Sequence, residues 1–485
     1  MDIKKNIAFN SILTVSSYIF PLLTYPYVAR VLGVENIGVC NFVDNLINYF
    51  ILFSMLGINA LGVREIAKCK SNEIKLGEVY SNLFLLNLIA TIIVLLALVI
   101  ATLTVSQLNE HWDLMFFGAA KIIFNLFLTE WFFRGIENFK YITIRSLIVK
   151  IVFVISVFIF IKERDDYSIY YLLMCSTVII NSILNTGYRR RFVKLSLKSI
   201  HLRPYMHGFF SLGVYMVLTS FYTFFNTIYL GFAVGELEVG YYTTATKFYQ
   251  IFLSLFSAIT TVMLPRISSL AAEGNFNEVK RLTDKSYEVL LTFSLPIIVL
   301  ATVFSPQIIS ILAGKGFEGA ILPMRIVMPL MLIVGIEQIL VIQLLVPMKK
   351  DKEVLINSIV GAILGVGLNL LLVKHFKSVG SALVWLTCET IVLLLSQIFV
   401  RKSIGLSFPF RKVLLNILYM LPIVAICVFF QWTYIEINDY VCFTIAAILS
   451  AIYYVWLSVF WQKNPLVLSL LKKTPLKRFY FIGGA

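Results

Sequence analysis

The chain has 485 residues, of which 59% are hydrophobic and only 14% are charged, and its mean hydropathy is +0.88. This composition excludes an ordinary soluble globular protein and indicates a polytopic membrane protein. The formal net charge of +15 raises the question of a nucleic-acid partner. The basic residues lie in short segments between apolar runs, however, and form no stripe with interleaved aromatic side chains. We therefore expect no nucleic acid as a partner.

Motifs of metal and nucleotide sites are absent from the sequence. The six cysteines and four histidines do not have the spacing of metal ligands. No G-x-x-x-x-G-K-[ST] sequence occurs, so the chain carries no ATPase of its own. We expect no catalytic residues, no metal and no cofactor.

Fourteen apolar stretches are long enough to cross a bilayer, which takes about 20 residues in a helix. They cover residues 6–29, 39–62, 79–103, 114–133, 142–161, 167–186, 208–231, 240–264, 287–311, 320–347, 354–373, 379–400, 413–431 and 440–461. The sequence thus predicts an all-α polytopic membrane protein with about 14 transmembrane helices.

The first stretch contains two prolines and ends at a charge. Pro21 and Pro26 each remove a backbone donor, so we expect the helix to kink there. A broken helix is tolerated in a bilayer where protein or a water-filled cavity satisfies the freed carbonyls. We therefore place this helix beside a lumen, with Arg30 as a fixed charge at its end.

The basic residues predict the orientation. If the N-terminus is inside, the segments on the inner side hold 31 of the 41 lysines and arginines. Basic residues near span ends are retained in the cytoplasm. We expect both termini to be cytoplasmic, with the positive charge also attracting anionic lipids of the inner leaflet.

An internal repeat occurs at an offset of 202 residues, because Gly33 and Gly38 match Gly235 and Gly240, and Arg64 matches Arg266. Six spans separate the copies, so the two halves have the same orientation and an axis along the membrane normal relates them. The expected domains are a six-helix lobe at 1–190, a second at 208–402, and two added helices with a basic cytoplasmic tail at 411–485. Chance alignment of Gly and Arg at span ends is the alternative.

A polar stripe occupies one helical face of the second span. Its members are spaced at i, i+3, i+4 and i+7, and three of them have polar counterparts 202 residues later; the two sets are Asn41, Asp44, Asn45 and Asn48, and Thr243, Lys247 and Gln250. Because lipid satisfies no polar group, the stripes must face a cavity or partner helices. Polar contacts between helices explain Asn and Thr well, whereas a cavity explains Asp44 and Lys247 better.

Four basic residues lie within spans, namely Lys121, Lys150, Lys247 and Arg325. An unpaired cation at membrane depth is costly, so each should face water, an acid or an anionic ligand. With Arg30, they predict a positive cavity that attracts an anion such as a diphosphate. Snorkelling to the interface is the alternative for each lysine.

Carboxylates within the spans suggest coupling to an ion. Asp44, Glu337 and Glu389 are candidates for a switch that depends on protonation; for the two glutamates, ion pairing with a neighbouring helix is the alternative. Glu130 lies four residues before Arg134, so we interpret it as half of an ordinary surface pair.

The FP-x4-PYVAR-x-LG run at Phe20 to Gly33, the basic N-terminal stub and the later Gly62-Val63-Arg64-Glu65 resemble oligosaccharide flippases of the polysaccharide transporter family. That family belongs to the multidrug/oligosaccharidyl-lipid/polysaccharide exporter superfamily. The resemblance covers essentially the whole chain. It implies a two-lobed alternating-access fold and a location in the bacterial cytoplasmic (inner) membrane.

The resemblance also implies a cargo. This would be an undecaprenyl-diphosphate-linked oligosaccharide, moved from the cytoplasmic to the periplasmic leaflet for capsule, O-antigen or exopolysaccharide assembly. A polysaccharide polymerase and glycosyltransferases would be functional partners, and membrane lipid would surround the chain. The alternatives are a cation-coupled multidrug exporter, which a basic lumen disfavours, and a membrane-bound glycan polymerase or acyltransferase. The short outer loops lack an H-x3-D pair, so we do not expect an enzyme.

Overall fold

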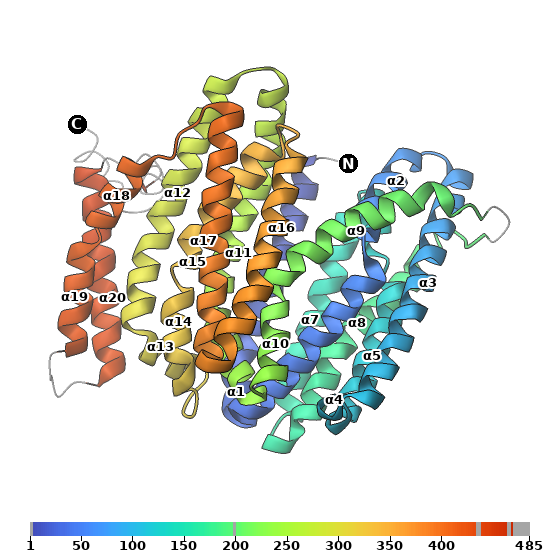
Figure 1. The fold of residues 1–485 in the computed structure, drawn as a ribbon, viewed down its shortest axis with the longest axis horizontal. Coiled ribbons are helices and arrows are strands. Elements are labelled where there is room, and N and C mark those ends of the chain that lie inside the picture. Colours follow the sequence, from blue (N-terminus) through green and yellow to red (C-terminus); the bar gives the residue numbers. More distant parts are fainter. Residues whose placement is uncertain (1–2, 197–199, 433–437, 463–466, 469–485) are drawn as a thin grey trace.

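The computed structural model describes residues 3–196, 200–432, 438–462 and 467–468, and every regular element in these ranges is a helix. The predicted all-α polytopic membrane fold is confirmed. Two groups of helices lean toward each other, with a helical pair at one flank (Figure 1). We call the first group the N-lobe (α1–α8) and the second group the C-lobe (α9–α17).

The N-lobe contains eight α-helices: α1 (Ile3–Met55), α2 (Ile58–Cys69), α3 (Glu73–Thr104), α4 (Ser106–Glu110), α5 (Trp112–Leu128), α6 (Glu130–Gly135), α7 (Phe139–Phe160) and α8 (Tyr167–Arg189). A short 3₁₀ turn, η1 (Arg164–Asp166), precedes α8.

The C-lobe contains nine α-helices: α9 (Arg203–Thr223), α10 (Phe225–Ala233), α11 (Glu236–Ala272), α12 (Phe276–Val303), α13 (Ser305–Leu312), α14 (Ile321–Val327), α15 (Leu330–Gln338), α16 (Asp351–Leu368) and α17 (Lys374–Ile404). The 3₁₀ turn η2 (Glu318–Ala320) precedes α14, and the π-helical segments η3 (Ile339–Leu345) and η4 (Asn369–Val373) follow α15 and α16.

The flanking pair consists of α18 (Phe410–Leu418) with α19 (Leu421–Trp432), and of α20 (Asp439–Trp456) with the π-helical η5 (Leu457–Trp461). It packs on α12 of the C-lobe, away from the N-lobe (Figure 1). Most of the predicted basic tail after Trp461 lies outside the described residues.

Helix α1 changes direction at Gly33. The backbone there has φ 77° and ψ 172°, a conformation that suits glycine, whereas Pro21 and Pro26 keep helical backbone angles. The sharp break therefore lies at Gly33 and not at the prolines. α1 begins on one side of the molecule, turns at the opposite side and returns toward α2 (Figure 1).

The number of membrane crossings depends on how the broken helices are counted. Ten helices in the described part of the chain are long and apolar enough to cross a membrane, and the α9–α10 pair, bent by 51°, adds an eleventh. Two of the ten are 44 and 54 residues long and contain the breaks at Gly33 and Lys377. Counting each of these two as two crossings gives thirteen, so the expected number of about fourteen stays a prediction.

The two lobes meet where α1 crosses α11. Gly235, which the repeat matches to Gly33, also has a positive φ, of 119°. Past each turn, a glycine lets the backbones touch: a Cβ on Gly38 would lie 1.9 Å from the carbonyl oxygen of Glu236, and one on Gly240 would lie 2.2 Å from that of Val34. The matched glycines thus make reciprocal contacts, as a two-fold relation between the lobes requires.

Candidate functional site

A cavity of about 440 Å³ lies within the N-lobe, and a single lining residue comes from the C-lobe. Both halves of α1 line it, together with α5 to α8, and α11 contributes Lys247. Five of the predicted site residues lie in this cavity: Asn41, Asp44, Lys121, Lys150 and Lys247. Of the polar stripe on the second span, Asn41 and Asp44 line the cavity.

The first polar group in the cavity is a closed network around Lys121. The Lys121 Nζ atom donates to Asp44 Oδ1 at 2.7 Å and to Asn48 Oδ1 at 2.8 Å, and Asn48 Nδ2 donates to Asp44 Oδ2 at 2.9 Å. Only 8% of Lys121 is exposed, so its charge is neutralised inside the protein and does not snorkel. The spacing of Asp44 and Asn48 by one helical turn places both on the same ammonium.

The wall between the lobes is also hydrogen-bonded. Asn41 Nδ2 donates to Thr243 Oγ1 at 3.0 Å, so two residues that the repeat matches contact each other. Beside them, the hydroxyls of Tyr25 and Thr244 lie 2.5 Å apart. These contacts hold the two halves of α1 against α11 along the cavity.

Two cations in the cavity have no carboxylate partner in the described part of the chain. Lys150 donates to the hydroxyls of Ser16 and Ser17, both at 2.9 Å. Lys247 lies over the ring of Tyr25, 5.5 Å from its centroid, in a cation–π contact. Hydroxyls and a ring face leave both charges available to an anion.

Glu130 is a cavity residue that we had interpreted as a surface residue. It accepts from Arg134 at 3.4 Å, as predicted, but also from the buried Arg145 at 2.7 Å. The helix is interrupted at Thr129, which has φ 40° and ψ 38°. Asn185 donates to the carbonyl of Leu128, which this interruption leaves without a helical partner. A glutamate within an otherwise apolar run was the only indication in the sequence that this residue could lie in the cavity. Its second partner, Arg145, is on another helix and therefore could not be predicted from local spacing.

Four predicted residues are not among those that line this cavity; one of them, Asn48, belongs to the Lys121 network described above. Arg30 is exposed and donates to the carbonyls of Ser310 and Ile311, at 3.2 and 2.6 Å, so it links α1 to α13. Gln250 is exposed on α11. Arg325 is exposed and donates to Ser305 Oγ at 2.8 Å. Helical periodicity gives the angles between side chains of one helix. It does not determine whether a given face of that helix points toward the cavity, a neighbouring helix or the outside.

The two remaining carboxyls meet in the C-lobe. Glu337 on α15 and Glu389 on α17 are hydrogen-bonded to each other, and the Trp385 indole donates to Glu389 Oε1 at 3.0 Å. In the described part of the chain, neither glutamate forms the ion pair with a basic residue that was the predicted alternative. A hydrogen bond between two carboxyl groups needs a proton on one of them, so the two side chains can gain or lose a proton as a pair.

The charges around the cavity do not balance. Four basic side chains line it, namely Lys121, Arg134, Lys150 and Lys247, against the carboxylates of Asp44 and Glu130. Low-dielectric walls focus such a net positive charge on the cavity. Among the described residues, no group of three or more His, Cys, Asp and Glu side chains could hold a metal ion. The cavity is suited to bind an anion without a metal.

Comparison with known protein families gives two matches. A family model described as "Polysaccharide biosynthesis protein" matches residues 3–271, and one described as "MatE" matches residues 212–371. The chain is 26% identical over 412 residues to a protein of Escherichia coli (strain K12) named as a candidate O-antigen transporter; the match covers 83% of this chain and 98% of the relative. A protein of Shigella dysenteriae with the same name is 25% identical over 405 residues, covering 81% and 98%.

Solved structures show the same fold. The lipid II flippase MurJ in an inward closed conformation matches with a TM-score of 0.76 at 18% identity, over 96% of this chain and 99% of that one. An inward-facing multidrug resistance MATE family transporter of the MOP superfamily matches with a TM-score of 0.62 at 14% identity, over 81% and 98%. The two-lobed membrane architecture is thus shared with transporters of this superfamily.

Proposed function

Because the chain belongs to the polysaccharide biosynthesis protein family, within the MOP superfamily of multi-pass membrane transporters, we propose that it is a flippase for a lipid-linked oligosaccharide. The cargo would be carried on undecaprenyl diphosphate. It would move from the cytoplasmic to the periplasmic leaflet of the bacterial inner membrane, for assembly of a cell-surface polysaccharide. The names of the relatives support this class of cargo.

The observation that carries the proposal is the pair of free cations in the cavity, Lys150 and Lys247. A diphosphate crossing a membrane loses its hydration, and ammonium groups that are not already paired can replace part of that water. The same two charges disfavour a cationic drug as cargo. The chain's own groups bind and orient the diphosphate and cleave no bond, so the proposed activity is transport and not catalysis.

The lobes define a direction for this passage. The cavity reaches from Leu13 and Arg134, near the side where α1 begins, toward Ile37, near its turn. On the turn side, Arg30 and the contacts of Gly38 and Gly240 join the lobes. With the positive-inside assignment, the first side is cytoplasmic and the turn side is periplasmic. Rocking of the lobes would open the periplasmic contacts to release the cargo.

The carboxyl pair of the C-lobe suggests what drives the rocking. A proton shared by Glu337 and Glu389 would hold the two carboxyls together, and its loss would place two negative charges side by side in a buried site. Such a pair has two states that differ in charge. We propose that proton binding and release at this pair is coupled to the position of the lobes, with Asp44 serving mainly as the partner of Lys121.

The test is leaflet exposure of an undecaprenyl diphosphate oligosaccharide in proteoliposomes, with the intact protein, Lys150→Ala and Lys247→Ala. A hydrogen bond to a charged group contributes about 1.5–3 kcal/mol, so each variant should lose roughly tenfold or more in apparent affinity. Arg325→Ala is the matched control, because it removes a basic side chain from a span outside the cavity.

Equal loss in the control would show that the cavity has no special part in recognition. No leaflet exchange with intact, folded protein would contradict the flippase function. Cargo that emerges with an altered glycan would favour an enzyme instead. Transport of cationic drugs without exchange of the lipid-linked cargo would favour the drug-exporter alternative.

A further inference from the structure

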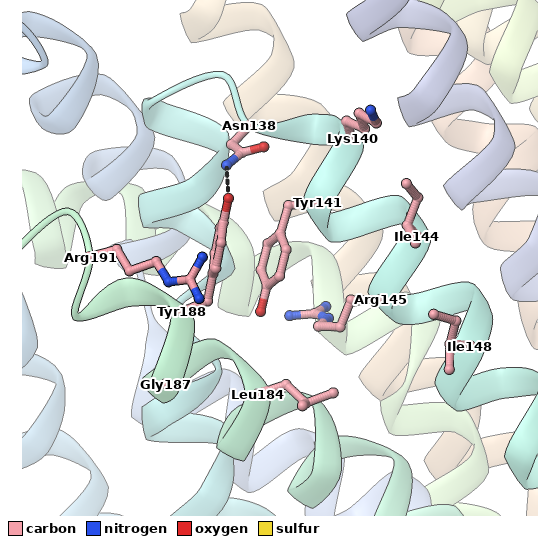
Figure 2. Close-up of a pocket in the computed structure, with 10 residues that line it drawn as sticks. All are labelled: Asn138, Lys140, Tyr141, Ile144, Arg145, Ile148, Leu184, Gly187, Tyr188 and Arg191. Carbon is pink, nitrogen blue, oxygen red and sulfur yellow. Dashed lines mark hydrogen bonds between the residues drawn. The ribbon is translucent and has the colours of Figure 1, made fainter.

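A second pocket, of about 610 Å³, lies on the N-lobe at the ends of α7 and α8 (Figure 2). None of its lining residues lines the 440 Å³ cavity described above, which we call the central cavity. Lys140 and Tyr141 from the start of α7 and Tyr188 and Arg191 from the end of α8 form its polar part. This end of the lobe is on the side that the charge distribution assigns to the cytoplasm.

The pocket lies on the outer face of α7. Successive residues of an α-helix are separated by about 100°, so Ile144 and Ile148, which line this pocket, point away from Ser146 and Lys150, which line the central cavity. Ile144 and Ile148 are 43% and 56% exposed, as expected for side chains that face lipid. The pocket therefore opens to the bilayer and not to the passage between the lobes.

An apolar track continues from the pocket along α7. After Ile148, the same face of α7 carries four more exposed apolar side chains: Ile151, Val152, Ile155 and Ile159. In the pocket itself, Leu184 of α8 adds a further exposed apolar side chain. A bound molecule with a polar end in the pocket could place an acyl chain on this track.

The polar end of the pocket is basic. Lys140 and Arg191 are exposed, and neither has a carboxylate partner in the part of the chain that the structure describes; Arg191 lies over the Tyr188 ring at 5.5 Å. The rings of Tyr141 and Tyr188 stack with their centroids 3.9 Å apart (Figure 2). Two free cations beside an aromatic pair suit a phosphate group.

Two buried donors in the pocket also have no acceptor in the described part of the chain. Arg145 is 5% exposed, and its Nε has no hydrogen-bond partner. The Tyr141 hydroxyl is also buried; it contacts the Arg145 guanidinium, which can only donate, so the hydroxyl proton has no acceptor among the described residues. In Figure 2 the Arg145 guanidinium is directed toward the hydroxyl end of Tyr141. Such groups are normally satisfied by protein or solvent, so two in one pocket point to a missing acceptor.

We propose that this pocket binds an anionic glycerophospholipid of the cytoplasmic leaflet. Its phosphate would contact Lys140, Arg191 and the Tyr141 hydroxyl, and its acyl chain would lie along Ile144 and Ile148. The position on the outer wall, with α7 between it and the cavity, favours a bulk membrane lipid over cargo in transit. Through Arg145, which pairs with Glu130 of the cavity, the bound lipid touches the wall of the transport site.

Native mass spectrometry of the full chain, taken from nanodiscs of phosphatidylglycerol or phosphatidylcholine, tests this assignment. The intact protein should retain one phosphatidylglycerol and no comparable phosphatidylcholine. Each basic residue near an anionic lipid contributes roughly fivefold, so the double variant Lys140→Ala, Arg191→Ala should retain about 25-fold less. Lys280→Ala, Lys285→Ala is the matched control, because it removes two exposed lysines from the same predicted side of the C-lobe.

Tyr141→Phe provides a variant of unchanged charge. It should lower retention severalfold with little loss of thermal stability, because Arg145 keeps its hydrogen bonds to Glu130 and Asn185. Tyr188→Phe, whose hydroxyl accepts from Asn138, should leave retention unchanged.

Equal retention of both lipids would overturn the assignment, as would equal loss in the C-lobe control. Displacement of phosphatidylglycerol by equimolar undecaprenyl diphosphate would overturn it in favour of cargo. These outcomes are independent of leaflet exchange, so they do not depend on the proposed function.

Discussion

The interiors of the two lobes handle charge in opposite ways. In the N-lobe, every carboxylate that lines the cavity is paired with a cation, and two cations remain free. In the C-lobe, the carboxyls of Glu337 and Glu389 contact each other and no cation among the described residues. The two lobes thus differ in chemistry: the groups of one suit the binding of an anion, and those of the other suit the gain and loss of a proton.

The largest expected effect comes from breaking the N-lobe pair. Asp44→Asn removes the negative charge that faces Lys121, which is 8% exposed. Breaking a buried ion pair from one side costs about 3–5 kcal/mol, because the other charge stays buried. We expect this loss in the free energy of unfolding in detergent. The double variant Asp44→Asn, Lys121→Met should recover most of it, and a single variant as stable as the intact protein would contradict the pairing.

The free cations should affect cargo binding more than stability. Lys247→Met removes the charge over Tyr25 but keeps an apolar stem of similar length. Its cargo affinity should fall roughly tenfold to a hundredfold, from the loss of about 1.5–3 kcal/mol. Lys247→Arg keeps the charge and the ring contact and should stay within about threefold. Equally weak cargo binding in both variants would indicate that the site depends on the shape of the Lys247 side chain and not on its charge.

The C-lobe pair should respond differently from the N-lobe pair. Glu389→Gln keeps a hydrogen-bonding group beside Glu337 and Trp385, so the change in unfolding free energy should be under about 1 kcal/mol. Transport driven by a pH gradient should nevertheless be lost, because the pair can no longer exchange its proton. Proteoliposomes with and without an imposed gradient measure this. Transport that keeps its full dependence on the gradient would remove the pair from the coupling step.

The smallest effect concerns the contact between the lobes at the turn side. The His111 imidazole, whose Nε2 lies 3.7 Å from Glu236 Oε1, and a hydrogen bond from Gln107 lower the pKa of Glu236 from 4.5 to about 2. A carboxyl whose pKa is lowered by folding stabilises above its ordinary pKa. This contribution is therefore present above pH 4.5 and is lost as pH falls toward 2. Unfolding measured across that window should show the loss, and Glu236→Gln should remove it; an unchanged pH dependence would contradict the contact.

Much of the fold was predictable from the sequence, because its signals are local. Bilayer thickness sets the length of each apolar run, so the all-α polytopic class follows from spacing alone. Gly33 and Gly235, one of the matched glycine pairs, lie at the two turns because glycine adopts their positive φ angles readily, whereas the sequence predicts the kink of the first helix at Pro21 and Pro26. The polar stripe around Asp44 was also predictable, because helical periodicity fixes which residues share a face.

The partners of the charged groups were decided by the tertiary structure. The sequence places Lys150 and Arg325 alike within apolar spans, yet one lines the cavity and the other is exposed outside it. Likewise, nothing local joins Glu130 to Arg145, or Glu337 to Glu389. Periodicity gives the angle between residues of one helix, whereas the rotation of each helix against its neighbours comes from packing of the whole fold. Which charges are paired, and which stay free for a ligand, depends on that rotation.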